Sequence, residues 1–110
     1  MRGFRGSGGG LRGIVWIMAA RLITYDLGEP EFEPVLLKYL ADNKATMITE
    51  SSYVLDTAKE PGTIVGEIRA LTKDHANVYV VTIVWPYSGW SKTPSKELAT
   101  MLPNPGAARR

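Results

Sequence analysis

The chain has no cysteine, a single histidine and no long apolar run among its 110 residues. The absence of cysteine excludes disulfide bonds, thiolate metal sites and a cysteine nucleophile, and it agrees with the reducing cytoplasm in which we expect the protein. No stretch approaches the roughly 18 apolar residues that a membrane-spanning helix needs, so we expect no membrane partner. Gly8, Gly9 and Gly10 match neither common spacing of a nucleotide-binding loop.

Charge is unevenly distributed along the chain, whose formal net charge is +2. Residues 1–17 carry three arginines and no acid, and residues 92–110 carry four basic residues and one acid. The region between them has six basic and ten acidic side chains, a net charge of −4. A protein that wraps nucleic-acid backbones normally has the opposite sign on its folded surface. A nucleic-acid role for this region would therefore depend on a divalent ion, a local patch or the basic ends.

We expect one folded domain over residues 18–90, flanked by two segments of different composition. A chain of 110 residues suits a single domain with one core. Residues 1–17 begin with a stretch rich in glycine and arginine. We expect them to be either a flexible basic arm or a non-native extension, in which case Met18 is the natural start. Residues 91–110 form a C-terminal tail, in which residues 95–102 predict a short helix.

The apolar pattern predicts the order strand, helix, strand, strand, helix, strand. The strands are predicted over residues 21–27, 45–49, 52–57 and 77–85, and the helices over residues 32–40 and 63–71. Asn43 is the predicted left-handed cap of the first helix, and Thr63 is the predicted N-cap of the second. Residues 77–85 are apolar on both faces, which predicts a central strand.

This order predicts an α+β protein with the ferredoxin-like βαββαβ plan. In that two-layer sandwich, both helices cover one face of a four-stranded antiparallel sheet. The other face of the sheet is left open. Apolar residues on both faces of residues 77–85 imply that the C-terminal tail or a second copy of the chain covers this open face. We favour a homodimer packed sheet to sheet.

The first strand ends in the sequence L-I-T-Y-D-L, from Leu22 to Leu27. This sequence resembles the first strand of the SinR-like proteins, relatives of the small CRISPR-associated adaptation and endoribonuclease subunit. Residues 50–55 look like the central strand pair of that family, and residues 77–85 are similar to its last core strand. VapD-type toxin ribonucleases share the same plan. The resemblance covers roughly residues 19–90 and implies a dimer in which Asp26 of each copy holds a divalent metal for phosphodiester cleavage.

Asp26 is accordingly the candidate catalytic residue and metal ligand. Two carboxylates from a symmetric dimer could share one Mg²⁺, which prefers oxygen ligands. The alternative is that Asp26 only ends its strand and hydrogen-bonds the backbone of the turn at residues 28–30. Ser51, Ser52 and Tyr53 are the candidate residues of an adjoining nucleic-acid-binding surface, although serine is also common in turns.

The sequence thus predicts a small dimeric nucleic-acid-associated protein, with metal-dependent ribonuclease activity as the catalytic form of this hypothesis. The alternative is a non-catalytic dimeric scaffold that binds another protein through its open sheet and its tails. His75 lies at a predicted helix end, where a cationic side chain is favourable, and we expect a surface cap there rather than a general base. The sequence does not distinguish RNA from DNA as the substrate.

Overall fold

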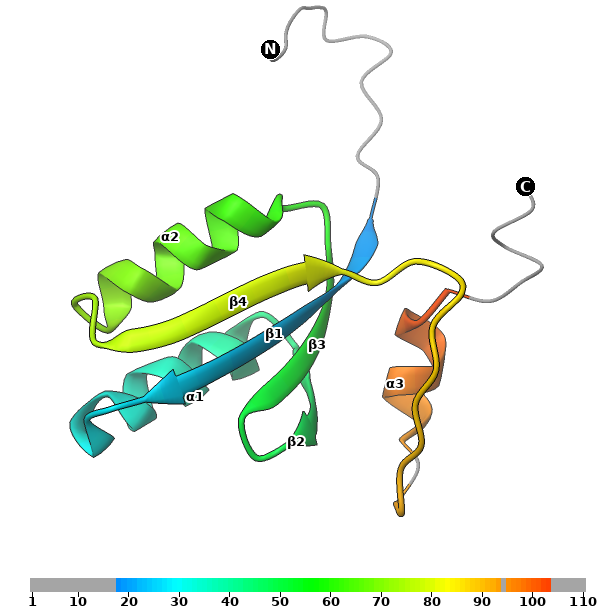
Figure 1. Cartoon of the computed structure of the whole chain (residues 1–110), viewed down its shortest axis with the longest axis horizontal. Helices are drawn as coiled ribbons and strands as arrows, with labels where there is room; N and C mark the ends of the chain where they lie inside the picture. Colours follow the sequence, from blue (N-terminus) through cyan, green and yellow to red (C-terminus); the bar gives the residue numbers. More distant parts are fainter. Residues whose placement is uncertain (1–17, 94, 104–110) are drawn as a thin grey trace, which may run out of the picture.

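The computed structural model describes residues 18–93 and 95–103. Within these residues the chain forms a four-stranded antiparallel sheet and three α-helices (Figure 1). The elements in chain order are β1 (Ala19–Leu27), a 3₁₀ turn η1 (Pro30–Phe32), α1 (Glu33–Asp42), β2 (Thr46–Thr49), β3 (Ser52–Thr57), α2 (Pro61–Leu71), β4 (Ala76–Thr82) and α3 (Lys96–Met101). The α+β class is confirmed, and the arrangement is compatible with a ferredoxin-like sandwich.

The strand order is β2-β3-β1-β4, so β1 lies inside the sheet and β4 lies at an edge. The prediction that this last strand is central was therefore wrong. Along β4, Val78 and Val80 are half-buried against the core, whereas Tyr79 and Val81 are 71% and 50% exposed. One face of β4 is apolar because it packs on the core, and the other carries exposed apolar residues. The apolar pattern therefore does not mean that β4 lies between two other strands.

The opposite edge of the sheet is formed by β2, which has only four residues. Met47 of β2 pairs with Tyr53 of β3, but the register then shifts before Thr49 pairs with Ser52. Such a shift disrupts the regular ladder and increases the local twist. The sheet therefore ends on this side in a short, irregular strand.

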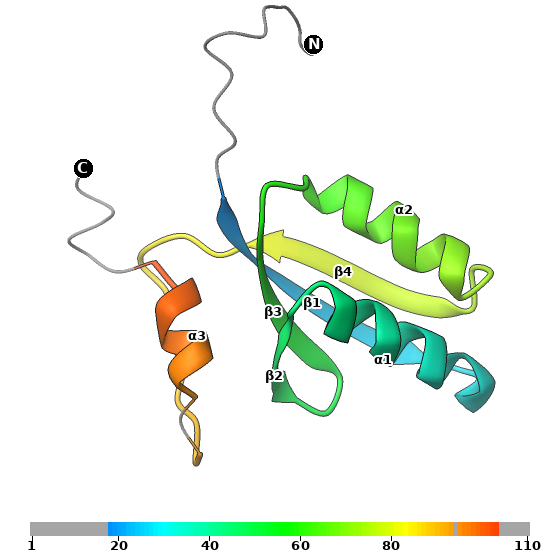
Figure 2. The same ribbon diagram turned by 180° about the vertical axis from the view of Figure 1, so that it is seen from behind.

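Helices α1 and α2 lie on the same face of the sheet, as the two opposite views show (Figures 1 and 2). Each helix has a proline in its first turn, where the missing N–H group leaves no helical hydrogen bond unmade. Because Pro61 starts α2, Glu60 is its N-cap residue and Thr63 lies inside the first turn. The prediction of Thr63 as the N-cap was therefore wrong.

The end of α1 also differs from the prediction. Asn43 has a φ of −91°, and the residue with a positive φ, at 60°, is Lys44. Asn43 instead donates a hydrogen bond from its side-chain Nδ2 to the backbone oxygen of Tyr39, at 2.8 Å. The left-handed residue is thus Lys44, one position after the cap residue, where helices commonly adopt this conformation.

The hydrophobic core lies between the sheet and the two long helices. Its buried members are Ile23, Tyr25, Leu36, Leu40, Leu55, Ile64 and Ile68. Alternate residues of β1 supply the sheet side, while residues four positions apart supply the side of each helix. Burial of each aliphatic side chain stabilises the fold by about 1.5–3 kcal/mol relative to exposure.

The C-terminal segment covers part of the open face. Val54 of β3 lies opposite Leu22 on this face, outside the core cluster, and is only 1% exposed. The short helix α3 contacts β3, and the hydroxyl of Tyr87 donates a 2.6 Å hydrogen bond to the backbone oxygen of Pro103 beyond α3. The C-terminal segment therefore covers the β3 side of this face, while Tyr79 and Val81 of β4 remain exposed.

No helix in the described ranges is long and apolar enough to cross a membrane. The predicted basic arm at residues 1–17 lies outside the described residues, as do residues 104–110 of the predicted tail.

Candidate functional site

Asp26 is the last but one residue of β1, and its side chain is exposed. Because successive side chains of a strand alternate between the two faces, Tyr25 and Leu27 face the helices while Asp26 faces the open side. Its carboxylate has neither a hydrogen bond nor an ion pair within the described part of the chain. The predicted bonds to the turn at residues 28–30 are therefore absent, and the carboxylate is available to a ligand.

A groove of about 750 Å³ lies at this end of β1. The backbone N–H of Tyr25 donates a 3.0 Å hydrogen bond to the oxygen of Ser51, which holds the β2–β3 turn beside the strand. Three of the four predicted site residues line this groove: Ser51 from the turn, Asp26 from the end of β1, and Tyr53 from the helix-covered face of the sheet. The other lining residues are Tyr25, Leu27, Pro30, Glu33, Leu37, Met47 and Glu50. With three carboxylic acids and no basic residue in its lining, the groove is acidic.

Ser52, the fourth predicted site residue, does not line this groove. It pairs with Thr24 of β1, and its hydroxyl donates a 3.1 Å hydrogen bond to Thr24 Oγ1. Both side chains lie on the open face of the sheet, on the same side as Asp26. The two serines consequently belong to different surfaces: Ser51 to the groove and Ser52 to the open face.

Asn77 is a further polar residue beside Asp26 that was not predicted. It lies near the start of β4, directly opposite Asp26 in the register of the two strands, and it is exposed. Opposite residues of antiparallel strands have their Cβ atoms about 4.5–5.5 Å apart. The sequence contained one signal, a polar residue at the start of an apolar strand, but the pairing of β4 with β1 was needed to interpret it.

The described residues contain no group of three or more histidine, cysteine or acidic side chains placed to hold a metal ion. On the open face, one copy offers the Asp26 carboxylate and the Asn77 amide at this position. Divalent ions such as Mg²⁺ bind through carboxylates and retain several waters. The donor set therefore suits Mg²⁺ in kind, but a protein site at this position needs ligands from a second copy.

Tyr25 forms an inner wall of the groove. Its ring stacks near that of Tyr53, with 6.3 Å between centroids, and its hydroxyl donates a long 3.4 Å hydrogen bond to the backbone oxygen of Glu50. Burial raises the pKa of the Tyr25 phenol, and the neighbouring Tyr53 and Glu33 raise it further. Tyr25 therefore remains protonated at neutral pH and acts as a hydrogen-bond donor rather than a base.

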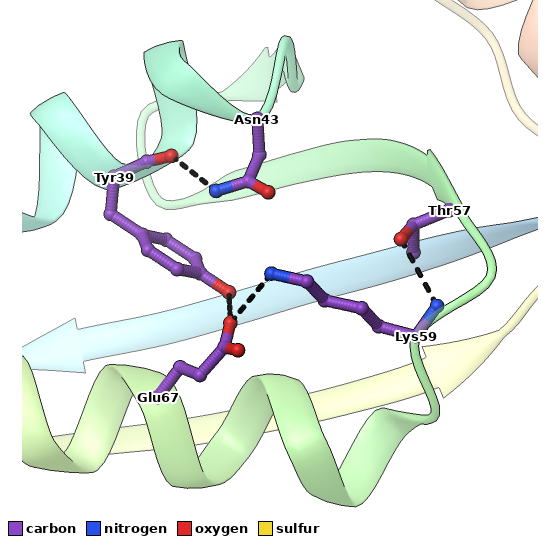
Figure 3. Close-up of polar contacts among 5 residues, drawn as sticks. All are labelled: Tyr39, Asn43, Thr57, Lys59 and Glu67. Carbon is purple, nitrogen blue, oxygen red and sulfur yellow. Dashed lines mark hydrogen bonds and ion pairs between the residues drawn. The ribbon is translucent and has the colours of Figure 1, made fainter.

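The other perturbed pKa values belong to a polar network between α1 and α2 (Figure 3). The Tyr39 hydroxyl donates to Glu67 Oε1 at 2.6 Å, and Lys59 Nζ lies 2.9 Å from the same oxygen. Burial and the bond to Glu67 raise the pKa of Tyr39, while the bonds from Tyr39 and Lys59 lower the pKa of Glu67. None of these residues lines the groove, so the network joins the helices rather than forming part of the site.

The His75 side chain makes no hydrogen bond or ion pair with Asp26 in the described part of the chain. Its ring stacks on Phe32 with 5.0 Å between centroids, and its Nδ1 lies 3.3 Å from the backbone oxygen of Thr72. The imidazole does not line the groove. It packs against the turn before α1 instead of facing a nucleophile.

Comparison of the chain with known protein families, with curated proteins and with solved structures gives no match.

Proposed function

We propose that the protein is a sheet-to-sheet homodimer in which Asp26 of both copies holds a divalent metal ion and promotes hydrolysis of nucleic-acid phosphodiesters. The observation that carries this proposal is the position of Asp26, exposed at the end of β1 on the open face and without a partner among the described residues. The resemblance of Leu22–Leu27 to the SinR-like proteins points to the same residue.

The exposed apolar residues of the open face support the dimer. Tyr79 and Val81 project from β4 on this face, with 71% and 50% of their surfaces exposed. Exposed apolar side chains that project from one face of a sheet are typical of a protein interface. A two-fold axis through the open faces would bring the same patch of each copy together and place both Asp26 carboxylates in one interface.

A divalent ion would supply the positive charge that the lining of the groove lacks. The Asp26 carboxylates of the two copies would hold this ion, which would supply positive charge to neutralise the phosphate and to lower the pKa of a water. In the proposed hydrolysis, a water oxygen would form the new bond to phosphorus, the bond to the sugar oxygen would break, and a proton from that water would pass to the leaving oxygen. Ser51 and Tyr53, in the groove beside Asp26, are the candidate contacts for the neighbouring nucleotide. Ser52 would contact it from the open face.

Cleavage of RNA and DNA oligonucleotides tests the proposal. Wild type, Asp26→Asn and Asp56→Asn are compared with Mg²⁺, with Mn²⁺ and with EDTA. Asp56 is a matched control because it is an exposed carboxylate on the same sheet face, opposite Ala20 at the other end of β1. We expect metal-dependent cleavage that falls to the EDTA level in Asp26→Asn and is unchanged in Asp56→Asn. Absence of cleavage by wild type, or equal cleavage by all three proteins, would contradict the proposal.

A second candidate function is a non-catalytic scaffold that binds another protein. It is favoured by the groove, where three carboxylates lie beside the exposed side chains of Leu37 and Met47, with no basic residue in the lining. Such a surface repels a phosphate backbone but suits a basic protein segment. Wild-type protein that is dimeric yet cleaves no oligonucleotide would favour this function.

A further inference from the structure

Asp26 and Asn77 form a cross-strand pair on the open face of the sheet. Both side chains are exposed, and neither has a side-chain hydrogen bond or ion pair within residues 18–93 and 95–103. Two other polar pairs across β1 differ, because their side chains bond to each other: the Ser52 hydroxyl donates to Thr24, and Arg21 Nη1 donates to Thr82 Oγ1. Asn77 therefore lies directly opposite Asp26 on the neighbouring strand, and its amide oxygen has no hydrogen-bond partner among the described residues.

The chemistry of this pair suits a hard divalent cation. Amide oxygens of asparagine bind such ions as carboxylate oxygens do. An aspartate at position 77 would place two like charges directly opposite each other, which destabilises a strand pair, whereas asparagine adds an oxygen without the charge. In a two-fold dimer the two Asp26 carboxylates carry a charge of −2, which one divalent ion neutralises.

We propose that Asn77 is the second metal ligand of the Asp26 site and supplies its amide oxygen. Each copy then contributes two side chains from two adjacent strands, and the dimer contributes four. This inference rests on the proposed function, since it requires the Asp26 site in a dimer. It adds a ligand on β4 and so ties metal binding to the pairing of β4 with β1.

Mn²⁺ binding to the full chain tests this inference without depending on activity. The loss of the free-ion signal in electron paramagnetic resonance measures the bound fraction. We expect Asn77→Ala to weaken binding by roughly tenfold or more, on the scale known for residues that support metal sites. Asn77→Asp should tighten binding, because it adds a negative charge. Asp26→Asn should abolish binding, and the matched Asp56→Asn should leave it within about twofold of wild type, because Asp56 lies at the far end of β1.

The outcomes separate the two proposals. Wild-type affinity in Asn77→Ala, with binding lost in Asp26→Asn, would overturn the role of Asn77 and leave the Asp26 site standing. Absence of Mn²⁺ binding in wild type, or full binding in Asp26→Asn, would overturn both. Circular dichroism and light scattering on each variant establish that it is folded and has the oligomeric state of wild type.

Discussion

The ionisation of Glu67 affects the stability of the fold, because its carboxylate binds residues from two other elements. Its carboxylate accepts the Tyr39 hydroxyl and pairs with Lys59, joining α1, α2 and the loop after β3 (Figure 3). The pKa of Glu67 is lowered from 4.5, so its stabilisation is present above pH 4.5 and is lost as the pH falls through the lowered pKa. The pKa of Tyr39 is raised from 10.0, so its stabilisation is present below pH 10.0 and is lost as the pH rises above that value.

Tyr39→Phe should therefore lower the free energy of unfolding by about 1 kcal/mol at pH 7, the usual contribution of such a hydrogen bond in a partly exposed pair. The difference from wild type should shrink towards pH 3 and above pH 10. Urea unfolding at the three pH values measures it, with Tyr79→Phe as a control because Tyr79 is 71% exposed. A difference that does not change with pH would contradict this account of the network.

Of the candidate site, the sequence predicted the proximity of Asp26, Ser51 and Tyr53, which line one groove. Their roles in catalysis and nucleic-acid binding stay predictions. The sequence missed two features. Asn77 lies 51 positions after Asp26 and meets it only through the register of β4 on β1. Ser52 was grouped with Ser51 by adjacency, but Ser51 lies in the β2–β3 turn, whereas Ser52 is the first residue of β3 and faces the open side.

At the scale of elements, the short helix α3 is expected to depend on its contact with β3 for stability. It has six residues, too few for a helix to be stable alone, and it contacts β3, whose Val54 is buried on the open face. The hydroxyl of Ser95 accepts a hydrogen bond from the N–H of Leu98 and caps its first turn. Both the cap and the packing are therefore needed to keep this helix in place.

Val54→Ala should cost about 2 kcal/mol of stability, because it removes buried methyl groups and leaves a space under α3. Amide hydrogen exchange in α3 should become faster than in wild type. Val81→Ala is the matched control, since Val81 lies on the same face but is 50% exposed, and its effect on both measurements should be small. Unchanged exchange in α3 with Val54→Ala would show that another contact holds the helix.

The number and order of the elements were predictable because each has a clear apolar period: Leu36 and Leu40 on α1, and Ile64 and Ile68 on α2, repeat at four residues and are all buried. The position of β4 was not predictable. An apolar run on both faces has the same appearance in a central strand as in an edge strand with an exposed interface. The N-cap of α2 was misplaced because Thr63, a common capping residue, lies just after Pro61 and Gly62, three residues beyond the observed cap at Glu60.

For the molecule as a whole, we expect the exposed side of β4 to form the interface of the proposed dimer. Val81→Lys should convert the proposed dimer to a monomer, raising the dissociation constant by roughly a hundredfold or more, because two desolvated like charges would meet near the two-fold axis. Light scattering coupled to size-exclusion chromatography measures the mass. Ala70→Lys, which adds the same charge on the exposed side of α2, should leave the mass unchanged. A wild-type monomer, or a dimer that survives Val81→Lys, would exclude this face as the interface.

The short and irregular β2 strand has a consequence for the behaviour of the protein at high concentration. A sheet grows into a fibril only if both of its edges can accept another strand, layer after layer. Four residues with a register shift between Met47 and Thr49 make a poor template on one side. Even if β4 captured a strand from a neighbour, elongation would stop at the next β2, so ordered fibrils should not form from the folded state.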